Sequence, residues 1–181
     1  PPMGPGCFMV NNPDRETRSA RISGELAVTA ETLLTLGADW QANEHTLRKL
    51  SSPTAAGADA YADRPRILDM ETRIAGVFGE LRHALSARAR WIAGLRLDDW
   101  SADRYNSTSG AFMADADEAL RSGFLRYEQD MAASPATLFV GIGHSQRPMD
   151  YWEASTYNGL TGTMRLDPER NTQLDAGMLW K

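Results

Sequence analysis

The stretch Arg66–Leu95 reads RILDMETRIAGVFGELRHALSARARWIAGL, and its large apolar residues recur at intervals of three and four. This spacing places them on one face of a helix, because an α-helix completes a turn in about 3.6 residues. Asp63 can cap such a helix, and Pro65 suits its first turn. The stretch therefore predicts one long helix. Its apolar face consists of Ile67, Met70, Ile74, Val77, Leu81, Ala84, Trp91 and Leu95.

A second stretch, residues 13–50, has the same spacing of apolar residues. Asn12 and Pro13 form a typical helix start, and the segment Ser51–Pro53 ends the pattern. The small, polar residues 51–64 are numerous enough for the chain to reverse direction. The two stretches therefore predict an antiparallel helical hairpin, with a heptad-like period that is typical of coiled coils and bundles.

The last third of the chain has a different period. Residues 111–133 predict a third helix, and the run Thr137–Ile142 is rich in strand-forming residues. Asn158-Gly159 lies between two alternating segments of residues 150–166, which is a strong β-hairpin signal. The predicted fold is mainly α: a long antiparallel helical hairpin plus a third helix, with a small C-terminal antiparallel β element. The predicted parts are an extended N-terminal arm (1–12), a helical hairpin or bundle (13–133) and a β element with a tail (134–181).

Composition limits the possible partners and locations of the chain. Its 181 residues have a net charge of −5 without a basic block, which argues against nucleic-acid binding. The single cysteine, Cys7, excludes an internal disulfide framework. No apolar run approaches the roughly 18 residues of a membrane-spanning helix, and the start lacks a signal-peptide pattern. We therefore expect a soluble protein without a membrane span, cytoplasmic or within a large assembly.

Two motifs resemble chemical sites, and neither is complete. Glu80 and His83 have the spacing of a di-iron ligand pair, but a second copy is missing, so a solvated helix face is the preferred interpretation. His144 and Ser145 could pair with Asp150, but such a set requires proximity in space. We assign no catalytic residue, metal ligand or cofactor.

Apolar and aromatic residues in the arm, the helices and the tail predict contacts with other proteins, because tryptophan is favoured at the centres of interfaces. We therefore predict a non-enzymatic structural or assembly subunit that binds other protein subunits. Two alternatives remain: a small enzyme or ligand-binding domain near His144, Ser145 and Asp150, with Arg147 as an anion contact, or a helical sensor module. The candidate interface residues are Cys7, Phe8, Val10, Trp40, Trp91, Trp152, Leu179 and Trp180.

Overall fold

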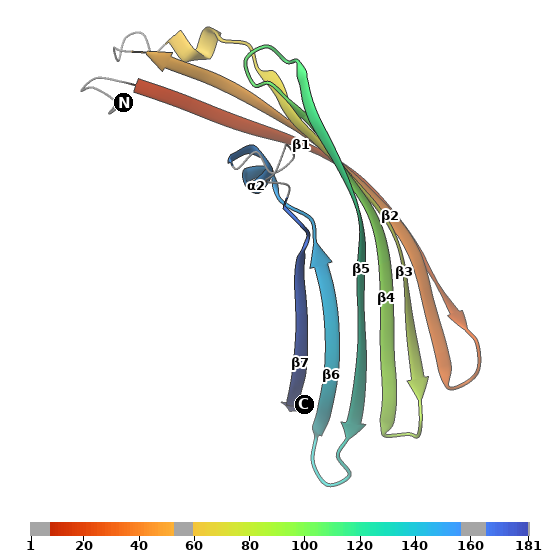
Figure 1. The fold of residues 1–181 in the computed structure, drawn as a ribbon. Helices are drawn as coiled ribbons and strands as arrows, with labels where there is room; N and C mark the ends of the chain where they lie inside the picture. Colours follow the sequence, from red (N-terminus) through yellow and green to blue (C-terminus); the bar gives the residue numbers. More distant parts are fainter. Residues whose placement is uncertain (1–7, 53–59, 157–165, 181) are drawn as a thin grey trace.

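The chain folds into one antiparallel β-sheet of seven strands, which follow one another in sequence order. A computed structural model describes residues 8–52, 60–156 and 166–180 (Figure 1). Two short helices accompany the sheet, η1 (Ala60–Asp63) and α2 (Tyr151–Thr156). The strands are β1 (Phe8–Ala27), β2 (Thr32–Ser52), β3 (Ile67–Ala84), β4 (Ala89–Tyr105), β5 (Phe112–Asp130), β6 (Ala136–Arg147) and β7 (Glu169–Trp180).

The prediction of a mainly α fold is wrong, and so are the helical hairpin and the coiled coil. The helix predicted over residues 13–50 corresponds to β1 and β2. The helix predicted over residues 66–95 corresponds to β3 and the start of β4, and the one over residues 111–133 corresponds to β5. The sheet runs through all three of the predicted parts. The run Thr137–Ile142 lies in β6, while Asn158-Gly159 falls outside the described residues.

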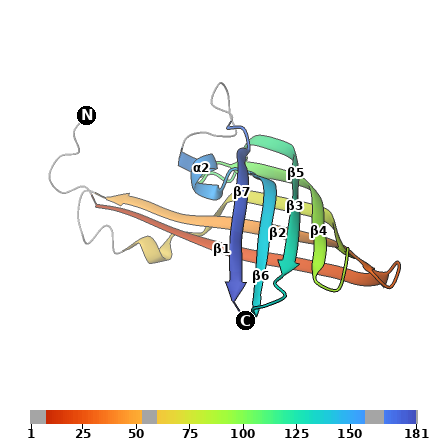
Figure 2. The ribbon, with the colours of Figure 1, turned by 90° about the horizontal axis from the view of Figure 1, so that it is seen from below.

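The connections between strands differ in length at the two ends of the sheet. Residues 28–31, 85–88 and 131–135 form short turns at one end, which we name the turn end (Figure 1). Each short turn is closed by a backbone hydrogen bond; Val28 N–H, for example, donates to Thr32 O over 2.9 Å. At the opposite end, which we name the loop end, the ends of β2 and β3, of β4 and β5, and of β6 and β7 are joined by longer connections of the sequence. β1 and β2 extend beyond the other strands there (Figure 2).

One face of the sheet carries exposed apolar residues along all seven strands. Successive side chains of a strand point to opposite faces, so the register identifies which residues share a face. Leu36, for example, pairs with Gly24 on β1 and with Gly79 on β3. We name the exposed residues of this face the apolar belt. Its members are Ile22, Leu26, Leu36, Val77, Leu81, Leu95, Leu97, Leu125, Leu138, Val140, Ile142, Leu174 and Met178.

The buried core lies on the other face. The sheet is curved, and α2 lies on its concave side, under the arc of β1 and β2 (Figure 1). Residues of α2 and of the segment before it pack against β3, β4 and β5, so the apolar belt occupies the convex face. The core consists of Met70, Trp100, Ala102, Ala116, Leu120, Met149 and Ala154. Among the described residues, no helix is both long enough and apolar enough to cross a bilayer.

Candidate functional site

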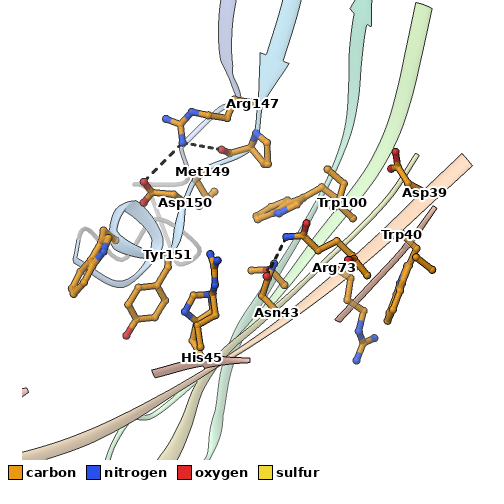
Figure 3. Close-up of a pocket in the computed structure, with 18 of the residues that line it drawn as sticks. Asp39, Trp40, Asn43, His45, Arg73, Trp100, Arg147, Met149, Asp150 and Tyr151 are labelled. Atoms are coloured by element: carbon orange, nitrogen blue, oxygen red, sulfur yellow. Dashed lines mark hydrogen bonds and ion pairs between the residues drawn. The ribbon is translucent and has the colours of Figure 1, made fainter. Parts of the chain in front are cut away.

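A pocket of about 1080 Å³ opens on the concave side, between β1–β4 and the segment 147–152 (Figure 3). Strand alternation supplies its polar wall, because every second residue of these strands faces inward. Gln41, Asn43 and His45 line it from β2, Trp100 from β4 and Tyr151 from α2. The pocket therefore combines amide, imidazole and aromatic groups on one concave surface.

A stacked pair of rings closes one side of this pocket. The rings of His45 and Tyr151 are 4.4 Å apart at their centroids and almost parallel, with an angle of 5° between them (Figure 3). Burial, with a smaller contribution from Arg15, holds the pKa of His45 below its ordinary value, while Asp69 opposes this shift. The folded chain therefore favours the neutral form of this imidazole over the charged form.

Tyr151 is also fixed by a hydrogen bond from its hydroxyl to Asp69 Oδ2, at 2.8 Å. The register of β2 and β3 shifts next to His45, which leaves Asp69 without a partner on β2. Such a bulge redirects a side chain, and here the carboxylate is buried, with 5% of its residue surface exposed. Burial and the bond to Asp69 raise the pKa of Tyr151, so the phenol stays protonated and acts as a donor.

The short helix α2 is stabilised by a capping box. The backbone N–H of Glu153 donates to Asp150 Oδ1 at 2.8 Å, and the N–H of Asp150 donates to Glu153 Oε2 at 2.7 Å. Arg147 binds Glu153 and also reaches Glu169 on β7, at 3.0 and 2.8 Å. The guanidinium holds the pKa of Glu153 below its ordinary value. These bonds tie the start of the loop to the end of β6.

On the concave face, the side chain of Arg96 extends from β4 across β3 to β2. Arg96 on β4 donates two hydrogen bonds to Asp39 on β2, at 2.8 and 2.6 Å, and also binds Asp98. Gly76 of β3 lies between Asp39 and Asp98 in the register. A Cβ atom on Gly76 would overlap the Asp98 carboxylate. The missing side chain of Gly76 thus makes room for this charged network.

The structure separates the residues of the predicted chemical motifs. His144 points to the convex face, where its Nδ1 lies 2.9 Å from Thr172 Oγ1. The adjacent Ser145 points to the concave face, and Asp150 caps α2, so no nucleophile–base–acid set forms. Glu80 and His83 likewise lie on opposite faces of β3. Within the described residues, no three His, Cys, Asp or Glu side chains gather into a possible metal site.

The candidate interface residues are distributed over both faces. Trp40, Trp91 and Trp180 lie on the convex face, Leu179 faces inward, and Trp152 on α2 is 61% exposed. Trp91 lies near the turn end, with its ring centroid 5.0 Å from that of Tyr127. Phe8 and Val10 lie in β1, and Cys7 is outside the described residues.

Two comparisons with known proteins agree with this architecture. The family model described as "TonB dependent receptor-like, beta-barrel" matches residues 8–181. The chain belongs to this family. It is similar to the solved structure of "Copper transporter OprC", with 31% sequence identity and a TM-score of 0.77. The match covers 96% of this chain and 29% of that one, so this chain spans under a third of OprC's length. No curated protein matches.

Membership of the TonB-dependent receptor-like family overturns several predictions. The expected soluble, cytoplasmic-type location is wrong, because this family forms β-barrels of the outer membrane. The statement that the chain lacks a membrane span is wrong for the same reason. A β-strand crosses a bilayer with only about 9–11 residues, half of them apolar, so no long apolar run is needed. The prediction of a helical assembly subunit is overturned as well.

Proposed function

We propose that this chain forms part of the wall of an outer-membrane transporter or receptor, which passes a solute through the barrel interior. The observation that carries the proposal is the contrast between the two faces of one continuous sheet. The convex face presents the apolar belt, whereas the concave face presents ion pairs such as Arg96 with Asp39. Transmembrane barrels have this arrangement, with apolar residues toward lipid and polar ones toward the lumen.

The height of the apolar belt supports this proposal. On β6 and β7 the outward residues are apolar over seven positions, Ala136–Ile142 and Leu174–Trp180, which at ~3.3 Å per residue and a tilt of ~40° span roughly 18 Å, most of the usual ~25 Å band. Aromatic residues mark its margins: Trp91, Tyr127 and Trp180 toward the turn end, and Trp40 toward the loop end. Such girdles are typical of the bilayer interfaces.

The unequal connections give the barrel wall an orientation. Outer-membrane barrels have short turns on the periplasmic side and long loops outside the cell. The turn end would then face the periplasm and the loop end the exterior. The pocket beside α2 would lie at the outer entrance, where a solute first meets the inner wall. In this role the chain binds and passes a solute without changing it chemically.

An uptake assay with the complete receptor tests the proposal. Copper is the first solute to measure, because the similar solved structure is named a copper transporter; a panel of small polar solutes follows. We expect cells that produce the receptor to accumulate one of these solutes, and His45→Ala to reduce that uptake. His83→Ala, on the convex face, is the matched control and should leave uptake unchanged. Equal uptake with and without the receptor, for every solute, would contradict a transport role.

A further inference from the structure

A row of polar and cationic side chains borders the apolar belt on β5, β6 and β7. The row has two lines. The line nearer the loop end consists of Arg121, Gln146 and Arg170, and the line nearer the turn end consists of His144 and Thr172. Gln146 pairs with Arg170 in the register, and His144 with Thr172. The backbone N–H of Arg121 donates to Gln146 Oε1 at 2.8 Å, which joins β5 to the same row. We name these five residues the cationic ledge.

The cationic ledge faces outward, on the same side as the apolar belt. Arg121 is four residues from Leu125, Gln146 four from Ile142, and Arg170 four from Leu174; an even separation keeps two side chains on one face. Leu125, Ile142 and Leu174 themselves form one row of the register. The ledge therefore begins directly where the apolar surface ends, on the side of the loop end.

Both arginines of the cationic ledge are exposed and lack a carboxylate partner. Neither Arg121 nor Arg170 forms an ion pair with another residue that the structure describes. Arg18 provides the contrast, because it also faces outward but binds Glu16 at 2.8 Å and lies 3.9 Å from Glu44. The positive charge on β5 and β7 is thus available to an external anion.

The position of the cationic ledge at the edge of the apolar belt indicates which class of anion it binds. Guanidinium groups bind phosphate through paired hydrogen bonds, and a basic site at the edge of an apolar surface is suited to a lipid headgroup. We propose that the cationic ledge binds a phosphate of an outer-leaflet phosphorylated glycolipid, whose acyl chains lie on Leu125, Ile142 and Leu174. This inference rests on the proposed placement of the chain in the outer membrane, with its loop end outward.

The test uses the complete receptor in phosphatidylcholine nanodiscs that contain a small fraction of lipid A. Retained lipid A is measured by native mass spectrometry for the wild type, for Arg121→Gln/Arg170→Gln and for Arg18→Gln. We expect the double variant to lose at least tenfold in lipid A affinity and Arg18→Gln to match the wild type. Lipid A that lacks one phosphate should bind more weakly, and millimolar inorganic phosphate should not displace the intact lipid.

Several results would overturn the proposal. Equal retention by the wild type and the double variant would show that lipid A binds elsewhere, and displacement by inorganic phosphate would indicate a simple anion site. Arg121→Lys/Arg170→Lys keeps the charge and should retain part of the affinity; if the Gln variant folds poorly, full loss in this Lys variant refutes the proposal. Failure of the wild type to insert into nanodiscs would instead contradict the proposed function.

Discussion

At the scale of a single residue, Tyr151 attaches α2 to the barrel wall. Its ring stacks on His45, and its hydroxyl donates to the buried carboxylate of Asp69. In Tyr151→Phe the stacking remains, but Asp69 loses a donor. Because a buried acceptor without a partner costs about 1–3 kcal/mol, we expect α2 to detach more often. Faster cleavage of residues 148–168 by an added protease measures this effect.

Tyr105→Phe is the matched control for that experiment. Tyr105 also donates to a carboxylate, that of Glu71 at 3.0 Å, but Glu71 lies on the convex face, opposite to α2. Removal of the Tyr105 hydroxyl should leave the cleavage of residues 148–168 unchanged. Equal cleavage in both variants and the wild type would mean that the bond to Asp69 does not hold α2 in place.

His45 makes the attachment of α2 dependent on pH. Its pKa is lower in the folded chain than the ordinary 6.5, mainly because the ring is buried. Below pH 6.5 the released ring therefore takes up a proton more readily than the stacked one, so stability is complete above that pH and is lost as the pH falls through the folded pKa. We expect protease cleavage of residues 148–168 to accelerate as the pH drops from 7 to about 5.

His45→Phe isolates this effect, because it preserves a stacking ring that cannot be protonated. The variant should show a flat cleavage rate over the same pH range. Glu153 also responds to acid, since Arg147 lowers its pKa, but a carboxylate titrates below the window of the imidazole. A pH profile that is unchanged in His45→Phe would assign the dependence to another group.

At the scale of single residues, the sequence predicts the start of α2 but not the inward position of Asp69. Asp150 and Glu153 have the spacing of a capping box, which predicts the start of α2; the expectation of a hairpin over residues 150–166 obscured it. The bulge that turns Asp69 inward depends on the pairing of β2 with β3, which the local sequence does not specify.

At the scale of an element, β3 explains why a helix was predicted. Its outward residues include Val77 and Leu81, and its inward residues include Met70, Ile74 and Phe78. Together the two faces produce intervals of three and four, because small residues separate the large apolar ones on each face. Strand alternation was clearer in β1, where polar residues separate Ile22, Gly24 and Leu26; such ~10-residue alternating segments are a weak signal individually.

Three glycines of the inner face accommodate aromatic rings from neighbouring strands. A Cβ on Gly94 would overlap the ring of Phe124, and Gly37 and Gly177 have the same relation to Phe78 and Phe139. We expect Gly94→Val to destabilise the barrel by about 1–3 kcal/mol through overpacking. The measurement is the fraction of receptor that keeps the fast mobility of a folded barrel on an unheated gel.

Gly24→Val is the control for Gly94→Val. Gly24 lies on the convex face, and a Cβ there meets no atom within 4 Å. Since valine favours strands, this variant should fold as well as the wild type. Equal losses in both variants would show that strand glycines are required for flexibility and not for aromatic packing.

At the scale of the whole molecule, the apolar belt exists only when seven strands lie in register. Leu95 is 75% exposed at the middle of this belt. We expect Leu95→Arg to cost about 2–4 kcal/mol, because the charge would lie in the hydrocarbon region. Ser101→Arg changes the same face of β4 beyond the belt and should have little effect. Urea unfolding of the receptor in lipid vesicles compares the two variants, and equal stability would contradict this placement of the bilayer.

The most direct test of the barrel-wall assignment is a spin-label scan of β6. Single cysteines replace each residue from Leu138 to Ser145 in the complete receptor in lipid, with Cys7→Ser, and each label's accessibility to oxygen and to a water-soluble nickel complex is measured. We predict a period of two: labels at positions 138, 140 and 142 favour oxygen, which dissolves in lipid, and labels at 139, 141 and 143 favour nickel. A period of three to four residues, or equal access of nickel at every position, would contradict the account.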